Sequence, residues 1–301
     1  MKKWELGKSS KCIICGSSRL KRYKTLISSF LIERAFGNKK QKTDLLLCEN
    51  CSIRFFELRP NEEQMSELYK DYRGEEYQKQ REKHESFYTP ELNYLLGHNP
   101  QAVKNRKEVL SNVLKKNVDI STIKTVLDYG GDQGQFIPDD LNAEKFVYEV
   151  SNIEPLNGIT SIANKEELKN YKWDLIMCCH VLEHVSYPVE LLNEILSLLS
   201  QGGLLYIELP NEPMIKSPRR KKSKLGRIIK RIIGDRVGKF RFILKKYAEE
   251  GNVFVYPIMN EHINFFEIKT FEHIFNSSKY QILNTHARVD STFISILVKK
   301  M

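Results

Sequence analysis

A glycine-rich turn limits the possible fold of this chain more than any other feature. In VLDYGGDQGQFIP, residues 126–138, an apolar run and an acid lead into three glycines within five positions. A strand that bends this sharply is typical of a nucleotide-binding α/β sheet. The dinucleotide pattern G-x-G-x-x-G requires glycine where Tyr129 stands, so the fit to it is poor. Read as an acid at Asp128 followed by Gly130 and Gly134, the turn offers bare backbone to a ligand without a diphosphate.

A carboxylate on the next predicted strand extends this pattern. KFVYEV places Glu149 at the strand end, about 20 residues after Asp128. A carboxylate in that position reaches across the sheet edge and accepts hydrogen bonds from both hydroxyls of a ribose. Together the turn and the carboxylate predict a nucleoside ligand that carries no phosphates.

The second half of the chain has the pattern of a layered α/β domain. Apolar runs alternate with helical stretches, which favours a mostly parallel sheet with crossover helices. VELLNEILSLLS is predicted as a helix because Pro188 stands at its start and Gly202 and Gly203 follow its end. The last two apolar runs meet at Asp290 and Ser291 with no room for a helix, so they must pair antiparallel. Strands are expected at 125–130, 145–150, 158–163 (weakly), 173–179, 203–210, 279–290 and 292–301.

The run WDLIMCCHVLEHVSYPVELLNEILSLLSQGGLLYIELPNE, residues 173–212, resembles the class I S-adenosylmethionine-dependent methyltransferases. The resemblance extends over residues 126–301 and implies a Rossmann-like α/β sheet, parallel with an antiparallel C-terminal edge hairpin. It also implies S-adenosylmethionine as the cofactor. One departure is Asp132, which replaces the middle glycine of the usual G-x-G-x-G. By this resemblance the methionine end is lined by Asp128, Gly130 and Gly134, the ribose is held by Glu149, and the sulfonium lies beside Cys179 and His180.

Two other interpretations of this region are weaker. The run from His180 to His184 matches H-x-x-E-H, the inverted zinc-protease motif. That chemistry requires both histidines on one helical face together with a third ligand, whereas His180 closes an apolar strand. Cys178 and Cys179 are expected to be small core residues, since adjacent strand residues point to opposite faces.

Four cysteines near the start form two pairs, Cys12 with Cys15 and Cys48 with Cys51. The two-residue spacing lets both sulfurs of a pair reach one tetrahedral ion about 2.3 Å away. We expect a structural Zn²⁺, because no candidate for a fifth ligand lies nearby. KCIICGSS and LLLCENCSIRFF are predicted as short strands that feed two knuckles, with a hairpin or helix at ISSFLIERAF between them. Residues 1–60 are thus predicted to be a small zinc-binding β module.

Residues 61–118 are polar, rich in tyrosine and helical in period, which predicts a helical connector that covers the active site. CIICG and CENCSIRFFELRPNEEQMSELYKDY, within residues 12–77, are similar to the zinc-binding N-terminal domain ahead of methyltransferases of sugar and cell-surface glycan pathways. In such relatives the module and the connector help to shape the acceptor pocket. The resemblance implies acceptor contacts for Tyr69, Tyr72 and Tyr77, with packing inside the connector as the alternative.

The segment EHINFF, residues 261–266, is similar to the place where such sugar methyltransferases have an acid and a histidine near the acceptor. Methyl transfer is an in-line displacement, so the enzyme must align a nucleophile and remove its proton. We expect His262 to be the catalytic base because imidazole titrates near neutral pH. Glu261 would orient it or bind a sugar hydroxyl. A packing or substrate-orienting role is the alternative for His262.

The net charge of +10 belongs to one segment. Between Lys216 and Lys246, fourteen Lys and Arg stand against the single acid Asp235, so the rest of the chain is slightly acidic. In a predicted insertion at about 212–255, apolar residues recur three or four apart opposite basic ones, which predicts one or two basic amphipathic helices. Such helices pack on their own domain, dock on anionic lipid headgroups or hold a phosphorylated acceptor.

The sequence indicates a cytoplasmic protein. No apolar run approaches the roughly 18 residues of a membrane span, and MKKWELGKSSKC has the charges of a signal peptide without its apolar core. In a reducing compartment the six cysteines are not expected to form disulfides. The basic segment 216–246 is the candidate contact with the inner face of the membrane.

Residues 119–301 are thus predicted to be a methyltransferase domain. The expected acceptor is an anionic small molecule or glycan: a sugar, a nucleotide sugar or a surface glycan. O-methylation is favoured over C-methylation, because the resembling C-methyltransferases continue through a further C-terminal domain. Two alternatives stay open, an RNA methyltransferase and a non-catalytic scaffold with a degenerate fold. A nucleic-acid partner is disfavoured because the basic charge is confined to one insertion.

Overall fold

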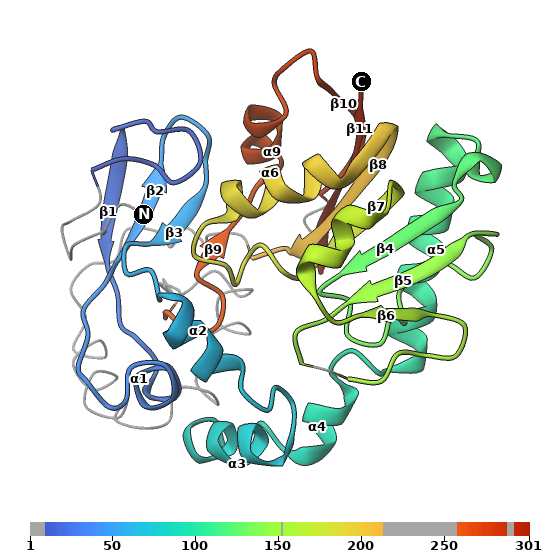
Figure 1. Ribbon diagram of the computed structural model, residues 1–301. Helices are drawn as coiled ribbons and strands as arrows, with labels where there is room; N and C mark the ends of the chain where they lie inside the picture. Colours follow the sequence, from blue (N-terminus) through green and yellow to red (C-terminus); the bar gives the residue numbers. More distant parts are fainter. Residues whose placement is uncertain (1–9, 152, 213–257, 288–291) are drawn as a thin grey trace.

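A computed structural model describes residues 10–151, 153–212, 258–287 and 292–301 (Figure 1). The predicted basic segment 216–246 and the joint at Asp290 and Ser291 lie outside these ranges. No helix in the described part of the chain is long and apolar enough to cross a membrane.

A seven-stranded sheet forms the larger half of the molecule. Its order is β10-β11-β8-β7-β4-β5-β6. Strands β8, β7, β4, β5 and β6 are parallel, and β11 pairs antiparallel with both β8 and β10. The parallel sheet with an antiparallel C-terminal hairpin is therefore confirmed. The strands are β4 (Thr125–Tyr129), β5 (Glu144–Tyr148), β6 (Thr160–Ile162), β7 (Trp173–Cys179), β8 (Leu199–Pro210), β10 (Tyr280–His286) and β11 (Phe293–Lys300).

Helices cover both faces of this sheet. On one face, α6 (Pro188–Leu198) buries Leu192, Ile195 and Leu196, the three-and-four spacing of one helical side. On the other face, α5 (Pro100–Asn117) buries Leu110 and Leu114. Smaller helical elements are η1 (Ile120–Thr122), η2 (Lys165–Asn170) and α9 (Ile268–Ile274). The alternation along β7 holds as predicted, since Cys178 packs in the core with α6 and Cys179 in the core with α5.

Three details of the prediction were wrong. Residues 130–143, between β4 and β5, form turns rather than a crossover helix, because three glycines and Pro138 leave too few helix formers. Helix α6 ends at Leu198 and β8 follows at once, so the chain turns before the predicted glycine stop. Residues 11–18 form turns instead of a strand, and the first strand begins only at Leu20.

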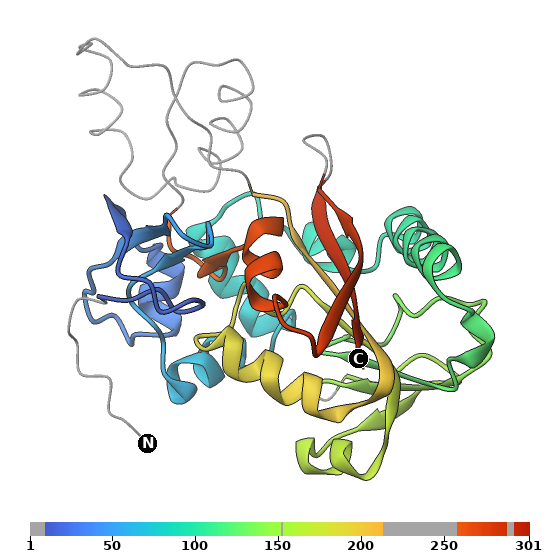
Figure 2. The ribbon, with the colours of Figure 1, turned by 90° about the horizontal axis from the view of Figure 1, so that it is seen from above.

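A second sheet, ordered β1-β2-β3-β9, lies beside the large one (Figures 1 and 2). Its first three strands are antiparallel neighbours, and α1 (Ser29–Arg34) fills the predicted hairpin-or-helix position. The fourth strand comes from the far end of the chain, where Arg54 and Phe55 face Phe265 and Asn264. The small sheet is therefore completed by the segment that follows His262. Its strands are β1 (Leu20–Lys24), β2 (Asp44–Cys48), β3 (Arg54–Phe56) and β9 (Asn264–Phe265).

The connector between the sheets is helical, with α2 (Glu62–Tyr69), α3 (Glu75–His84) and α4 (Pro90–Leu95) ahead of α5. Asn61 and Thr89 cap α2 and α4 with their side chains, and each accepts a hydrogen bond from a first-turn amide. In Figure 1 these helices pass below the gap that separates the two sheets. The connector thus bridges the ends of the parallel strands and the small sheet.

Candidate active site

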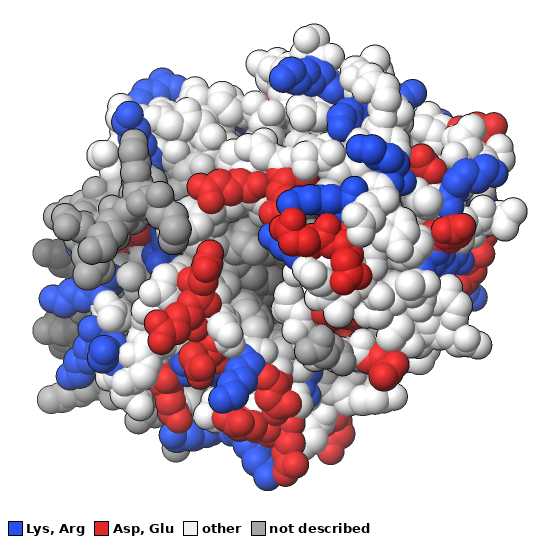
Figure 3. Space-filling view, in the orientation of Figure 1, with Lys and Arg blue, Asp and Glu red and all other residues white. Residues whose placement is uncertain are grey.

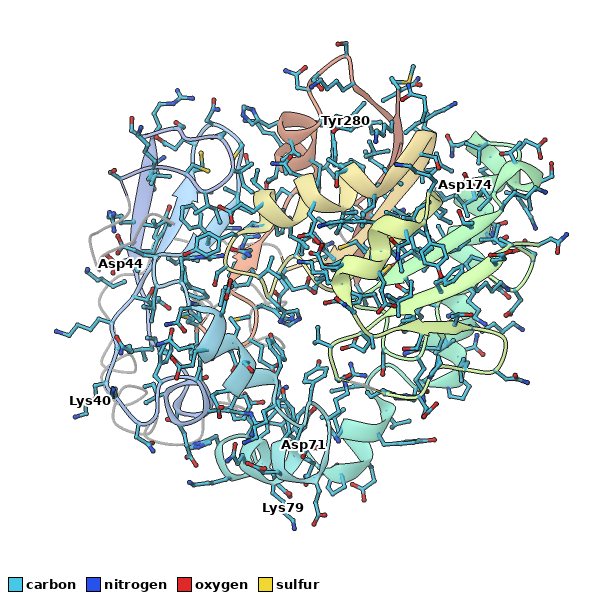
Figure 4. The ribbon with its side chains drawn as sticks, in the orientation of Figure 1. Lys40, Asp44, Asp71, Lys79, Asp174 and Tyr280 are labelled. Atoms are coloured by element: carbon cyan, nitrogen blue, oxygen red, sulfur yellow. The ribbon has the colours of Figure 1, made fainter. Side chains whose placement is uncertain are left out.

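The carboxyl ends of the parallel strands meet at the centre of the molecule. The chain adds β5 and β6 on one side of β4 and then returns to place β7 on the other side. Ligands of open α/β sheets bind at such a reversal, beyond the carboxyl ends of the strands. Asp174, near the start of β7, lies at the outer edge, whereas Asp71 of the connector lies across the gap (Figure 4). The glycine turn, Glu149 and His180 all follow strand ends at this inner edge.

The glycine turn has a tightly packed backbone. Gly130 and Gly134 have φ angles of 70° and 75°, in the left-handed region that favours glycine. A Cβ at Gly130 would lie 2.7 Å from Val181, and one at Gly134 would lie 2.7 Å from Ile159. Asp132 takes φ 58° in place of the usual glycine, a conformation that Asp tolerates better than most residues. The turn therefore keeps its bend although Asp132 replaces the middle glycine of G-x-G-x-G.

Two carboxylates flank this turn. Asp128 is fully buried, and neither of its oxygens has a hydrogen-bond partner among the described residues. Burial, together with the nearby charges of Glu149 and Glu208, raises the pKa of Asp128 to about 7 against the opposing effect of Arg106. A cationic group, such as the amino group of a bound amino acid, would compensate this orphaned carboxylate.

Glu149 points toward the bend. Its Oε2 accepts a hydrogen bond from the Asp132 amide at 3.2 Å, and Oε1 accepts from the Ser151 amide and hydroxyl at 3.0 Å. Oε2 keeps a second lone pair for one ribose hydroxyl, and the other hydroxyl would take the place of the Ser151 hydroxyl on Oε1. The turn and Glu149 thus have the arrangement that an adenosine without phosphates requires.

A cavity of about 950 Å³ lies between this edge and the connector. The space-filling view shows the same face hollowed between the two halves of the molecule, with acidic side chains on its rims (Figure 3). Tyr69 and Tyr72 contribute to its walls, whereas Tyr77 is buried in the connector core and accepts a hydrogen bond from Arg81. Its walls include Asp132, Val150, Ser151 and Ile153 from the sheet edge and Tyr69, Lys70, Tyr72, Arg73, Tyr94 and His98 from the connector.

The connector also contacts the glycine turn directly. Arg73 Nη1 lies 3.3 Å from Asp132 Oδ2, and Gln135 donates to the same oxygen at 3.2 Å. Arg73 itself has φ 63°, and its main-chain oxygen accepts a hydrogen bond from Asn93. Sequence analysis missed this pair, because nothing in the local pattern around Arg73 indicates a partner 59 residues away.

His180 occupies a constrained position directly after β7. Its φ is 58°, uncommon for a residue with a side chain, and its amide donates to the Glu208 carbonyl at 2.8 Å. Nδ1 lies 3.3 Å from Glu183 Oε1, and Nε2 lies 3.3 Å from Glu208 Oε1. Burial lowers the pKa of His180, but these two carboxylates raise it to about 9. His180 is therefore a cation at neutral pH. Burial keeps neighbouring Cys179 as an unreactive thiol by raising its pKa.

His184 follows Glu183 and faces Tyr69 of the connector. Its Nδ1 is 2.8 Å from the Tyr69 hydroxyl and 3.2 Å from the Glu261 carbonyl oxygen. Burial lowers the pKa of His184 to about 4, so the ring is neutral. Residues 182–184 form a turn, which rules out the helical H-x-x-E-H arrangement.

Glu183, His184 and His262 bring metal-ligand atoms within 4.8 Å of one another. Each of them has a protein partner in the structure: Glu183 faces His180 at 3.3 Å, His184 contacts the Tyr69 hydroxyl at 2.8 Å, and His262 contacts Glu212 at 3.0 Å. We interpret these three side chains as a polar network.

The predicted pair Glu261 and His262 has different partners from those expected. The Glu261 carboxylate accepts from Arg81 of α3 at 2.7 Å, and burial raises its pKa to about 7. His262 Nδ1 instead lies 3.0 Å from Glu212 Oε2. The two side chains therefore have separate hydrogen-bond partners in the structure. Sequence analysis missed Glu212, although its place just after β8 at the same sheet edge is a usable signal.

The four N-terminal cysteines come together as predicted. The Sγ atoms of Cys12 and Cys51 are 3.6 Å apart, and those of Cys15 and Cys48 are 3.5 Å apart. Sulfurs around one tetrahedral ion with 2.3 Å bonds would be about 3.8 Å apart, so the spacing suits Zn²⁺.

The two cysteine knuckles share one geometry. Gly16 and Ser52 each follow the second cysteine with positive φ, of 67° and 66°. The amide of each donates to the carbonyl of the first cysteine, at 3.0 Å in both knuckles. The repeated turn aims both sulfurs of a pair at a common centre, as metal-binding knuckles do.

A family model described as "Methyltransferase domain" matches residues 76–285, more than half of the chain. A search of curated proteins found no match. Similar solved structures include magnesium protoporphyrin IX methyltransferase from Synechocystis PCC 6803 with bound SAH, at 13% identity, with 68% of this chain and 84% of that chain covered and a TM-score of 0.42. The plantazolicin methyltransferase in complex with SAH has 16% identity, coverages of 78% and 93%, and a TM-score of 0.45.

The fold and the crevice at its strand ends define a class I, S-adenosylmethionine-dependent methyltransferase. The chain belongs to the methyltransferase domain family. It is therefore a transferase, and the crevice is the expected place for its cofactor.

Proposed function

We propose that this methyltransferase transfers a methyl group to a hydroxyl of a sugar, a nucleotide-linked sugar or a surface glycan. The cavity between the cofactor edge and the connector carries the proposal. Its tyrosines suit the faces of a sugar ring, and nearby carboxylates and histidines suit its hydroxyls. The negative charge predicted for the acceptor has no support from this wall, because Lys70 and Arg73 stand beside Glu62, Asp71 and Asp132, and Arg73 already pairs with Asp132.

We assign the cofactor residues from the geometry of the inner edge. S-adenosylmethionine, when bound, supplies a methyl group on a positively charged sulfur. Asp128 would compensate the amino group of its methionine part, Glu149 would accept from the ribose, and the backbone of Gly130 and Gly134 would let the ligand approach closely. Cys179 and His180 close the edge on the side of β7.

His262 is the proposed base. Nε2 of His262 would take the proton of the acceptor hydroxyl as that oxygen is methylated, and bound S-adenosylmethionine would supply the methyl group. Nδ1 is held by Glu212, which leaves Nε2 for this task. Glu261 binds Arg81 and fixes the connector next to the acceptor.

We also propose that the cysteine cluster holds a structural Zn²⁺. Three of the four cysteines are buried, and the spacing of the sulfurs suits one ion with no open position. The ion would stabilise the small sheet. In that sheet β3 pairs with β9, the strand that directly follows His262.

Replacing His262 by Asn is expected to lower kcat about a hundredfold, because Asn keeps hydrogen bonding but cannot accept the proton. Transfer of labelled methyl groups to a pool of nucleotide sugars and glycans, read by mass spectrometry, first identifies the acceptor. Calorimetry then checks that the variant binds S-adenosylmethionine normally. His273→Asn is the matched control, because His273 is exposed on α9. Near-normal turnover of His262→Asn would reject His262 as the base.

A further inference from the structure

Glu212 lies at the point where three distant segments meet. It follows β8, its carboxylate contacts the ring of His262 at 3.0 Å, and its carbonyl oxygen accepts from Arg54 Nη2 at 2.7 Å. Hydrogen bonds of ionised groups are roughly twice as strong as neutral ones. Arg54 therefore fixes the main chain of Glu212, while the Glu212 carboxylate holds the ring of His262.

Arg54 fixes both members of this pair. It belongs to β3 of the small sheet, is buried, and faces Phe265 in the β3–β9 register. Its guanidinium lies over the Phe265 ring at 5.4 Å and donates to the Glu212 carbonyl. Phe265 follows His262 by three residues. Arg54 therefore contacts both the strand that follows His262 and the backbone of Glu212, the carboxylate partner of His262.

We propose that Glu212 is the positioning residue of His262 and that Arg54 of the small sheet holds Glu212 in place. This inference rests on the proposed base role of His262. Glu212 selects the ring orientation in which Nδ1 donates to it, and its charge stabilises the imidazolium that forms when Nε2 takes a proton. Orientation of a base by a carboxylate is a common device of proton-transfer sites.

Other charged groups also face His262. Glu183 and His184 approach it from the turn after β7, with the two imidazole centroids 4.8 Å apart, and Glu261 precedes it in the chain. Burial favours the neutral ring, but the hydrogen bond and charge of Glu212, followed by the charges of Glu183 and Glu261, raise the pKa of His262. Since Glu212 makes the direct hydrogen bond, its removal is expected to have the largest effect on the ring.

The test is an NMR titration of the histidine rings in the full-length protein, which has seven histidines. His262→Asn assigns the resonance by its disappearance. In Glu212→Gln the His262 resonance is expected to titrate at lower pH than in the wild type, because a charge that favoured the imidazolium is gone. Glu212→Asp is expected to restore part of the difference. Glu272→Gln is the matched control, since it removes the same charge from an exposed position of α9.

Once an acceptor is known, kinetics give a second readout. Glu212→Gln is expected to lower kcat about tenfold or more. The acidic limb of kcat/KM should move to lower pH, since the base loses its proton at lower pH. Binding of S-adenosylmethionine should not change. An unaltered His262 titration in Glu212→Gln, or an equal change in Glu272→Gln, overturns the inference. The NMR result does not depend on turnover, so a failure of the proposed sugar function is distinguishable from a failure of this pair.

Discussion

Replacing Glu149 by alanine is expected to weaken binding of S-adenosylmethionine about a hundredfold. Glu149 already holds the Asp132 amide at 3.2 Å; its Oε2 keeps a lone pair for one ribose hydroxyl, and the other hydroxyl would replace the Ser151 hydroxyl on Oε1. Loss of charge-assisted hydrogen bonds to both hydroxyls costs about 3 kcal/mol, which corresponds to about a hundredfold in Kd. Isothermal calorimetry with the full-length protein measures this change directly.

The matched control is Glu144→Ala. Glu144 begins the same strand, β5, and is exposed at the opposite end. Its removal should leave the Kd unchanged, whereas equal weakening in both variants would point to a general loss of structure. Wild-type affinity in Glu149→Ala would show that the ribose is held elsewhere.

Replacing Cys51 by serine is expected to abolish binding of the proposed Zn²⁺ and to unfold the small sheet. Cys51 is fully buried, and the Thr270 hydroxyl of α9 donates to its carbonyl at 2.9 Å. Structural Zn²⁺ in zinc-finger peptides contributes about 10 kcal/mol or more, comparable to the whole stability of a small domain. Metal analysis of the purified protein and thermal unfolding measure the two effects.

The damage should reach the acceptor side but spare the cofactor. Strand β9 depends on β3 and directly follows His262, so turnover should fall more than affinity for S-adenosylmethionine. Cys178→Ala serves as the control, because Cys178 is equally buried in the large sheet and far from the cluster in sequence. Cys51→Ser with full zinc content and unaltered melting would refute a metal-stabilised sheet.

Local sequence patterns predicted the large sheet well because most of its strands carry an apolar run of their own, bounded by turn residues. Residues close together in the sequence are enough to predict three of its features: the alternation along β7, the antiparallel pairing of β10 and β11, and the bend at Gly130. Strand β9 could not be found in this way, since two residues carry no period and its partner β3 lies about 200 residues earlier.

The polar partners of the site were harder to predict than its residue types. Glu261 and His262 lie next to each other in sequence, yet their side chains pair with Arg81 and Glu212. Such pairings depend on which elements pack together in the fold, and the pattern of a single sequence does not predict that packing. The rule that ligands bind beyond the carboxyl ends of parallel strands did place Glu149 at the bend. That position depends only on the direction of the strands and on where they end.

The most direct test of the account is a calorimetric comparison of S-adenosylmethionine with a nicotinamide dinucleotide. The glycine turn continues into turns rather than a helix, so it offers no helix N-terminus to a diphosphate. Asp128 and Glu149 provide negative charge for a cationic nucleoside. The full-length protein should bind S-adenosylmethionine at a single site and give no heat with the dinucleotide. Binding of the dinucleotide alone, or of neither ligand, would contradict the assignment of this crevice.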